Sequence, residues 1–151
     1  MADALIIDAV RTPRGIGKVG KGSLAHLHPQ HLGKTVLEAL VERNEFDTAD
    51  VDDVVWGTSA QTGKQGGDLG RMSALAAGYN TKASGVTLDR FCGAGITATN
   101  FAANSVMAGM EHLVIAGGCE MMSLKHPGLL PMGAGNEHLQ EIHPQSHQGV
   151  C

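Results

Sequence analysis

One cysteine stands where the sequence predicts a strand to run into a helix. Cys92 follows a short apolar run at residues 85–88 and precedes Gly93-Ala94-Gly95. Unsatisfied N–H groups and the dipole at a helix start favour negative charge, so they stabilise a thiolate over a thiol. The two glycines leave room for a substrate carbonyl to approach both the sulfur and the N–H donors. Cys92 is therefore the predicted covalent nucleophile, with its backbone N–H as a candidate oxyanion donor.

Two other interpretations of this stretch stay open. A cysteine can be a small buried apolar residue, and this is the interpretation for Cys119 and Cys151. Residues 93–98 also spell G-x-G-x-x-A, which is typical of dinucleotide-binding domains when it joins a strand to a helix. Against that alternative, Asp-Arg-Phe-Cys precedes Gly93 where such a domain has a smooth apolar strand.

The segment after Cys92 contains no charged residue from Phe91 to Met110. A helix that is small or apolar nearly all round has no water face, which predicts that it is buried centrally in the domain. A membrane span is the competing interpretation, and five polar residues argue against it: Thr97, Thr99, Asn100, Asn104 and Ser105.

Apolar runs and helical periodicity alternate along the rest of the chain. Strands are predicted at residues 4–10, 54–56, 85–88 and 113–118, and helices at residues 31–43, 69–77 and after Cys92. This alternation predicts an α/β fold with a mixed, mainly parallel sheet. Cys92 then lies at the carboxyl end of a strand, where open α/β sheets place their sites.

Composition narrows the classes of partner. The formal net charge of the 151 residues is −4 and no Lys/Arg block stands out, so neither nucleic acid nor an anionic membrane is an indicated partner. Three cysteines without a CxxC pair and an N-terminus without a leader pattern favour the cytoplasm. The spacing His143-x3-His147 lacks a completing ligand, and Pro144 opposes a helix there, so no metal site is predicted.

Four blocks in order resemble the thiolases, the family of acetyl-CoA acetyltransferases and 3-ketoacyl-CoA thiolases. They are residues 7–13 with the loop at 22–25, the Gln/Gly-rich loop at 57–71, Asp89-Arg90-Phe91-Cys92-Gly93-Ala94-Gly95, and residues 116–123. The resemblance implies a thiolase N-terminal half, with an α/β domain at 1–123 and the start of a loop region at 124–151.

The same resemblance implies an acyltransferase of fatty acid metabolism that uses acyl-CoA and needs no cofactor. Cys92 would take the acyl group, and a second acyl-CoA would attack that thioester in a Claisen condensation, or thiolysis would cleave a 3-ketoacyl-CoA. Glu120 and the glycines at 117–118 would shape the site, while no coenzyme A-binding residue is assigned. The loop at 61–67 would pack across a partner in a dimer or tetramer.

Two features depart from the family pattern. Asp89 and Ala94 stand where the family usually has Asn and often Ser. Asp89 would add a negative charge near the Cys92 sulfur unless Arg90 or another cation offsets it, which is expected to work against a thiolate. The family fold is two similar halves, and the base histidine and acid cysteine belong to the half that would follow. The chain is therefore expected to be either a fragment or one half of a split enzyme. It should need the complementary half, be inactive alone, and expose a large apolar face. A non-catalytic subunit of thiolase shape is the alternative.

Overall fold

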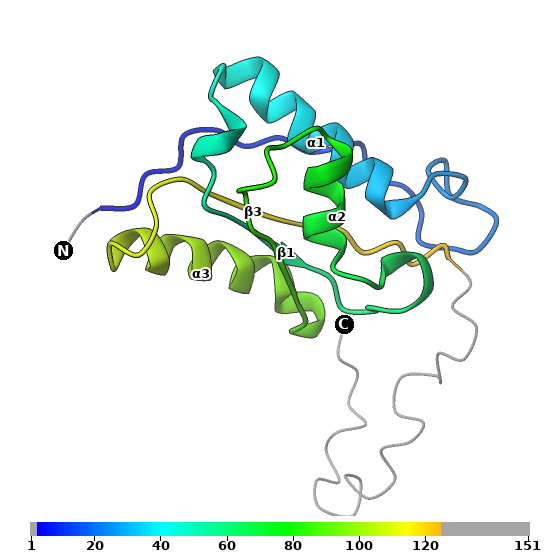
Figure 1. The fold of residues 1–151 in the computed structure, drawn as a ribbon. Coiled ribbons are helices and arrows are strands. Elements are labelled where there is room, and N and C mark those ends of the chain that lie inside the picture. The colour runs from blue at the N-terminus through cyan, green and yellow to red at the C-terminus, as the bar shows by residue number, and fades with distance from the viewer. Residues whose placement is uncertain (1–2, 125–151) are drawn as a thin grey trace, which may run out of the picture.

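The structure, a computed structural model, describes residues 3–124 and shows a parallel sheet with helices on both faces (Figure 1). The helices are α1 (Pro29–Asn44), α2 (Leu69–Ala76) and α3 (Ala94–Met107), and the strands are β1 (Asp53–Gly57), β2 (Val86–Leu88) and β3 (Val114–Gly118). Short 3-10 turns cover Thr48–Asp50, Gly63–Gln65 and Phe91–Gly93. The predicted α/β class and parallel pairing are confirmed. The proposed domain boundary at residue 123 lies at the limit of the described residues.

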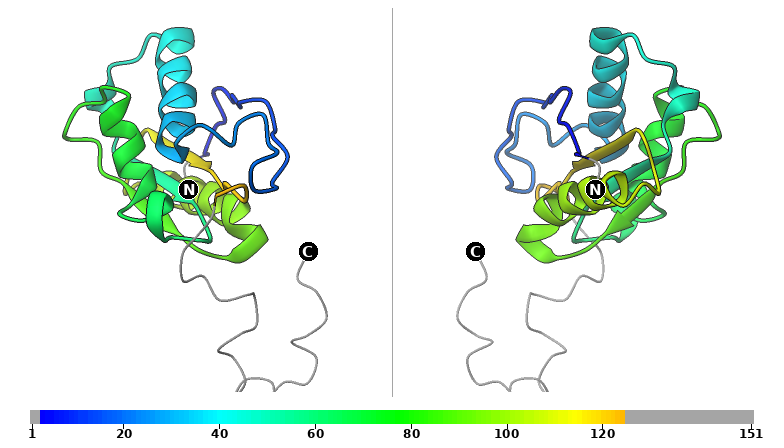
Figure 2. Two further views of the ribbon diagram at one scale, coloured as in Figure 1. Left: turned by 90° about the vertical axis from the view of Figure 1, so that its right-hand side faces the viewer. Right: turned by 90° about the vertical axis from the view of Figure 1, so that its left-hand side faces the viewer.

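The strand order β2-β1-β3 puts β1 in the middle of the sheet. Both pairings are parallel, and β1 ends with Gly57 beside Leu88 of β2 on one side and Gly118 of β3 on the other. Helices α1 and α2 cover one face of the sheet and α3 covers the other, as the turned views show (Figure 2). All three strands therefore deliver their carboxyl ends to one edge of the molecule.

Trp56 fills the face of the sheet that α1 and α2 cover. Its side chain is 2% exposed and belongs to the main apolar core. A methyl group at Gly70 would lie 2.4 Å from Trp56 Cβ, and one at Gly117 would lie 2.5 Å from Trp56 Cζ3. Only glycine leaves enough room at these two positions, so α2 and β3 can pack directly against the indole.

Gly57, the next residue of β1, faces α3 because successive strand residues point to opposite faces. A methyl group there would lie 2.8 Å from the carbonyl carbon of Ala94 and 2.9 Å from the nitrogen of Gly95. The first turn of α3 thus rests on the backbone of β1. This contact fixes where the helix that follows Cys92 begins.

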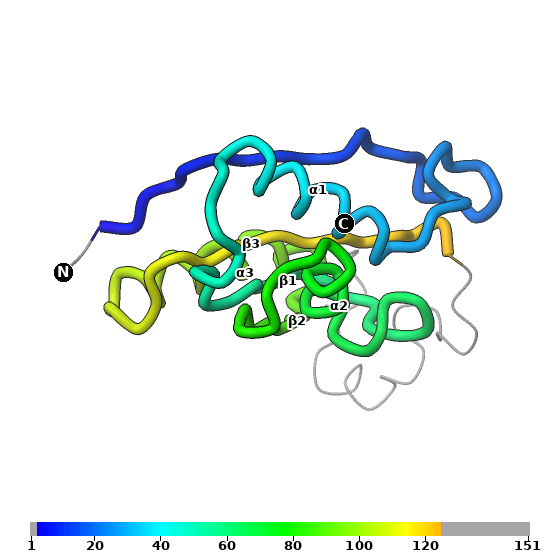
Figure 3. The backbone as a smooth tube through the Cα atoms, turned by 45° about the horizontal axis from the view of Figure 1, so that its top comes forward, coloured from blue at the N-terminus to red at the C-terminus, as the bar shows by residue number. Residues whose placement is uncertain are grey.

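The predicted strand at residues 4–10 is wrong in this structure. The segment is extended but joins no strand, and Leu5, Ile6 and Ile7 are 82%, 84% and 73% exposed. It runs along the side of the molecule where β3 and α1 lie (Figure 3). A cavity of about 420 Å³ is lined by residues 8–15, residues 115–120 and α1, so the apolar run does not reach β3 for ladder hydrogen bonds.

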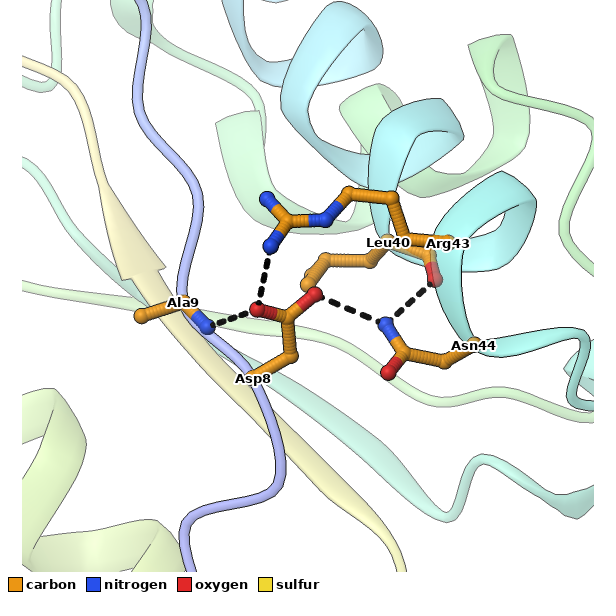
Figure 4. Close-up of polar contacts among 5 residues, drawn as sticks. All are labelled: Asp8, Ala9, Leu40, Arg43 and Asn44. Atoms are coloured by element: carbon orange, nitrogen blue, oxygen red, sulfur yellow. Dashed lines mark hydrogen bonds and ion pairs between the residues drawn. The ribbon is translucent and has the colours of Figure 1, made fainter.

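A polar cluster ties this segment to the end of α1 (Figure 4). Asp8 Oδ1 accepts hydrogen bonds from Arg43 Nη2 at 2.9 Å and from the Ala9 N–H at 2.7 Å, and Asp8 Oδ2 accepts one from Asn44 Nδ2 at 2.9 Å. The Asn44 hydrogen bond is the main cause that lowers the pKa of Asp8, and Arg43 contributes by its charge. The segment is therefore held at one point rather than by a strand ladder.

The predicted central burial of the helix after Cys92 is only half right. Ala94, Ala98 and Ala102 of α3 are buried against the sheet, whereas Ile96 is 71% and Phe101 is 51% exposed. The small residues pack closely on β1 and β3, and the larger apolar ones lie on the opposite face. This agrees with the expected exposed apolar surface. Within residues 3–124, every helix is too short or too polar to cross a membrane.

Replacing Gly57 with alanine is expected to lower the free energy of unfolding by about 2 kcal/mol, because the new methyl group meets backbone atoms of α3 that cannot move aside. Chemical denaturation measures the change. Gly95→Ala is the matched control: nothing lies within 4 Å of its added methyl group, so alanine in this helix should be neutral or stabilising by up to about 1 kcal/mol. Equal losses in both variants would contradict the close contact.

Candidate active site around Cys92

Cys92 lies between a strand end and a helix start, as the sequence predicts. Strand β2 ends at Leu88, the 3-10 turn Phe91–Gly93 contains the cysteine, and α3 begins at Ala94. The Cys92 side chain is exposed. The thiol is therefore accessible at the carboxyl edge of the sheet, beside the positive end of a 14-residue helix. Its role as a nucleophile stays a prediction.

The turn that carries Cys92 has an unusual backbone. Phe91 has φ of 47°, in the left-handed region that non-glycine residues rarely adopt. Asp89 Oδ1 accepts a hydrogen bond from the Phe91 N–H at 2.7 Å, and Arg90 O accepts one from the Gly93 N–H at 3.0 Å. These local bonds bend the chain sharply, so that the cysteine comes directly before the first turn of α3.

Strand β2 is anchored on both sides just before this turn. The Thr58 N–H donates to Leu88 O at 3.0 Å, which joins the exit of β2 to the exit of β1. On the other side, Thr87 Oγ1 donates to Asp68 Oδ1 at 2.7 Å and accepts from the Gly70 N–H at 3.0 Å. Asp68 also caps α2. The start of α2 and the end of β1 therefore fix the strand that leads to Cys92.

Gln65 links the polar loop after β1 to the segment after β3. Its side chain is fully buried. Gln65 Nε2 donates to Glu120 Oε1 at 2.9 Å and to Ala60 O at 3.1 Å, and Gln65 Oε1 accepts from the Met121 N–H at 2.5 Å. Glu120 Oε2 in turn accepts from the Ser59 N–H at 2.7 Å. Glu120 thus holds two loops together, and its expected role in shaping the site stays a prediction.

Cys119 differs from Cys92 in its surroundings. It is partly buried and packs against the main core, as the apolar interpretation expects. Burial, with a smaller contribution from the charge of Glu120, raises the pKa of the Cys119 thiol to about 11. The thiol therefore stays protonated in neutral solution. Cys151 and the pair His143 and His147 lie outside the described residues.

The sequence pattern did not reveal the structural roles of two residues at the carboxyl edge of the sheet. Gln65 looked like one amide among several in a polar loop, and only its burial distinguishes it. Asp89 stood out for its charge, whereas the structure shows it accepting a backbone hydrogen bond. An Asp two residues before a turn amide is a recognisable local signal. Among residues 3–124, no group of three or more His, Cys, Asp or Glu side chains could hold a metal ion.

The fold and the blocks around Cys92 match one family. A family model described as the thiolase N-terminal domain matches residues 4–143, so the chain belongs to the thiolase family. The fold also matches the crystal structure of the Bacillus anthracis acetyl-CoA acetyltransferase, with a TM-score of 0.65 and 33% identity over 75% of this chain and 29% of that one. Family membership replaces the dinucleotide-binding alternative as the explanation of the glycines after Cys92.

Two relatives show how much of the family length is present. A steroid 3-ketoacyl-CoA thiolase of Mycobacterium tuberculosis is 44% identical over 123 residues, and a beta-ketoadipyl-CoA thiolase of Acinetobacter baylyi is 43% identical over 124 residues. Each match covers 82% of this chain and 30% of the relative. The chain therefore spans less than a third of the length of these relatives.

Gln65→Ala is expected to lower the free energy of unfolding by about 2 kcal/mol, because it leaves buried polar groups without partners and opens a gap. Chemical denaturation measures the loss. Gln61→Ala removes the same side chain from the same loop at an exposed position, where Gln61 Nε2 donates to Thr58 O at 3.1 Å, and the expected loss is smaller, about 0.5 kcal/mol. A Gln65 variant no less stable than the Gln61 variant would contradict the linking role.

Alkylation of the folded chain near pH 8 should label Cys92 first and leave Cys119 protected, since the first is exposed and the second stays protonated. Peptide mapping after timed treatment with iodoacetamide measures both rates. Unfolded chain is the control, and there both should react. Rapid labelling of Cys119 in the folded chain would contradict the difference between the two thiols.

The raised pKa of Cys119 also makes the stability of the fold depend on pH. Because the folded Cys119 thiol ionises at a higher pH than the unfolded one, the free energy of unfolding should fall as the pH rises from about 9 towards 11.

Proposed function

We propose that this chain is the acyl-accepting part of a thiolase and that Cys92 is its nucleophile. The observation that carries the proposal is the exposed thiol in the turn that begins α3, inside the block that resembles the family's nucleophile motif. A helix start favours the thiolate and offers N–H donors to a developing oxyanion. The substrate class is an acyl-CoA thioester, as the names of the relatives suggest.

The first step forms an acyl-enzyme. The Cys92 thiolate attacks the carbonyl carbon of the acyl-CoA, the new carbon–sulfur bond forms, and the bond to the coenzyme A sulfur breaks. Coenzyme A leaves as a thiol after taking a proton. In the second step the α-carbanion of another acyl-CoA attacks the acyl-cysteine, a carbon–carbon bond forms, and the Cys92 thiolate is released. Thiolysis of a 3-ketoacyl-CoA is the same sequence in reverse.

The second step needs a base for the α-proton, and the family resemblance assigns that base to the complementary half. Without a positioned base this step would lose roughly 100- to 10,000-fold in rate. The chain is therefore proposed to act with that half, in a dimer or tetramer, in the cytoplasm. The polar loop at 61–67, whose residues 61–64 are exposed, is the proposed contact with a second subunit.

A second candidate function is a non-catalytic subunit of thiolase shape. The exposed apolar face of α3 favours this alternative, because Ile96 and Phe101 are each more than half exposed within the described residues and could dock to a partner chain. Under that alternative the site is unused and the thiol takes up no acyl group. The two functions therefore differ in one measurable outcome.

Incubation with acetyl-CoA, with the complementary thiolase half supplied as a separate chain, should leave one acetyl group on Cys92. Intact-mass analysis followed by peptide mapping detects it. Cys92→Ser should abolish the uptake, since a serine hydroxyl is not ionised here, and Cys119→Ser is the matched control that should retain it. Absence of acetylation with both halves present would leave the non-catalytic alternative.

A further inference from the structure

Asp89 closes the turn that presents Cys92. It is the first residue after β2, and its Oδ1 lies 2.7 Å from the Phe91 nitrogen. The carbonyl of Leu88, one residue earlier, accepts the Thr58 N–H at 3.0 Å. The chain is therefore fixed to the neighbouring strand before Asp89 and to the Asp89 side chain directly after it. This pair of contacts sets the direction in which the backbone reaches Cys92.

The turn carries a conformational cost next to the cysteine. Phe91 is held at φ of 47°, where a side chain crowds the backbone, and such residues persist only when their surroundings compensate. Phe91 is 60% exposed, so packing of its ring contributes little of that compensation. Two hydrogen bonds hold the Phe91 backbone in the bent form: its N–H donates to Asp89 Oδ1, and its carbonyl accepts from the Ala94 N–H. The bond to Asp89 ties Phe91 back towards β2, and its loss would let Phe91 relax towards an ordinary conformation and carry Cys92 with it.

We propose that Asp89 is a positioning residue for Cys92, which it holds at the start of α3 through the hydrogen bond to Phe91. The proposal rests on the proposed role of Cys92 as the nucleophile. The turn needs an acceptor oxygen for the Phe91 N–H, and a neutral amide oxygen can supply it as well as a carboxylate oxygen. An asparagine would keep the oxygen and remove the charge, whereas an alanine would remove both.

Other charged groups at this end of the sheet do not replace Asp89. Arg90 lies in the turn itself and can offset part of the charge. The carboxylate of Glu120, after β3, is already engaged by Ser59 and Gln65. Asp68 is engaged by Thr87 and caps α2. The comparison of Asn and Ala at position 89 therefore isolates the hydrogen bond, since both variants lack the charge.

The test measures the rate at which iodoacetamide labels Cys92 in the full 151-residue chain near pH 8, by peptide mapping. Asp89→Asn should react at least as fast as the unchanged protein. Asp89→Ala should react about threefold slower than Asp89→Asn, because Cys92 is then no longer held beside the free N–H groups that begin α3, where a helix favours negative charge. Cys92 is already exposed, so a looser turn gains little from better access.

Two controls separate positioning from general loss of structure. Labelling of Cys119 reports unfolding, because that thiol is partly buried, and its rate should not change in either variant. Asp47→Ala removes a similar side-chain cap elsewhere, where Asp47 Oδ1 accepts from the Ala49 N–H at 2.8 Å, and it should leave Cys92 unchanged.

Equal rates in Asp89→Asn and Asp89→Ala would overturn the proposal, as would an Asp89→Asn variant slower than the unchanged protein. A rise in Cys119 labelling in Asp89→Ala alone would also overturn it, because the residue would then support the whole domain rather than the turn. Alkylation needs neither acyl-CoA nor the complementary half. A failure of the proposed thiolase function therefore shows as absent acetylation, and a failure of the Asp89 proposal shows as unchanged alkylation.

Discussion

The close approach of α3 to β1 at Gly57 is the constraint on which the site depends. No side chain separates the two backbones there, so the helix start is placed by main-chain contact rather than by adjustable packing. Gly57 also meets Gly118 of β3, whose added methyl group would lie 2.6 Å from Gly57 O. The central strand thus brings a helix and a neighbouring strand together at the residue where it ends.

Around that contact, side-chain hydrogen bonds join segments that apolar packing would join in a domain with a larger core. Gln65 and Glu120 join the loop after β1 to the segment after β3, and Asp68 joins α2 to β2 through Thr87. Each link crosses between segments that end at the same edge of the sheet. The edge that presents Cys92 is therefore rigid because its loops are tied to one another, and the thiol can remain exposed without being loosely held.

Sequence patterns predicted the three paired strands and all three helices, because each has a strong apolar run or helical period. They also placed Cys92 at a strand–helix junction, since glycines and a charge-free segment mark it. They failed for residues 4–10, where an apolar run predicts burial but cannot show whether a neighbouring strand is within reach. They assigned Asp89 a charge effect only, because side-chain to backbone hydrogen bonds depend on φ values that composition does not reveal.

The unpaired outer edge of β3 should affect how the chain behaves in concentrated solution. In the part of the chain that the structure describes, β3 is an edge strand of the sheet, and its residues Val114–Gly118 include no charged or proline residue that would discourage pairing. Such an edge is a template for strands of other molecules, and aggregation follows when it is left open. Concentrated samples of the chain alone should therefore be prone to self-association through β3, and a strand that filled the adjoining cavity would protect them.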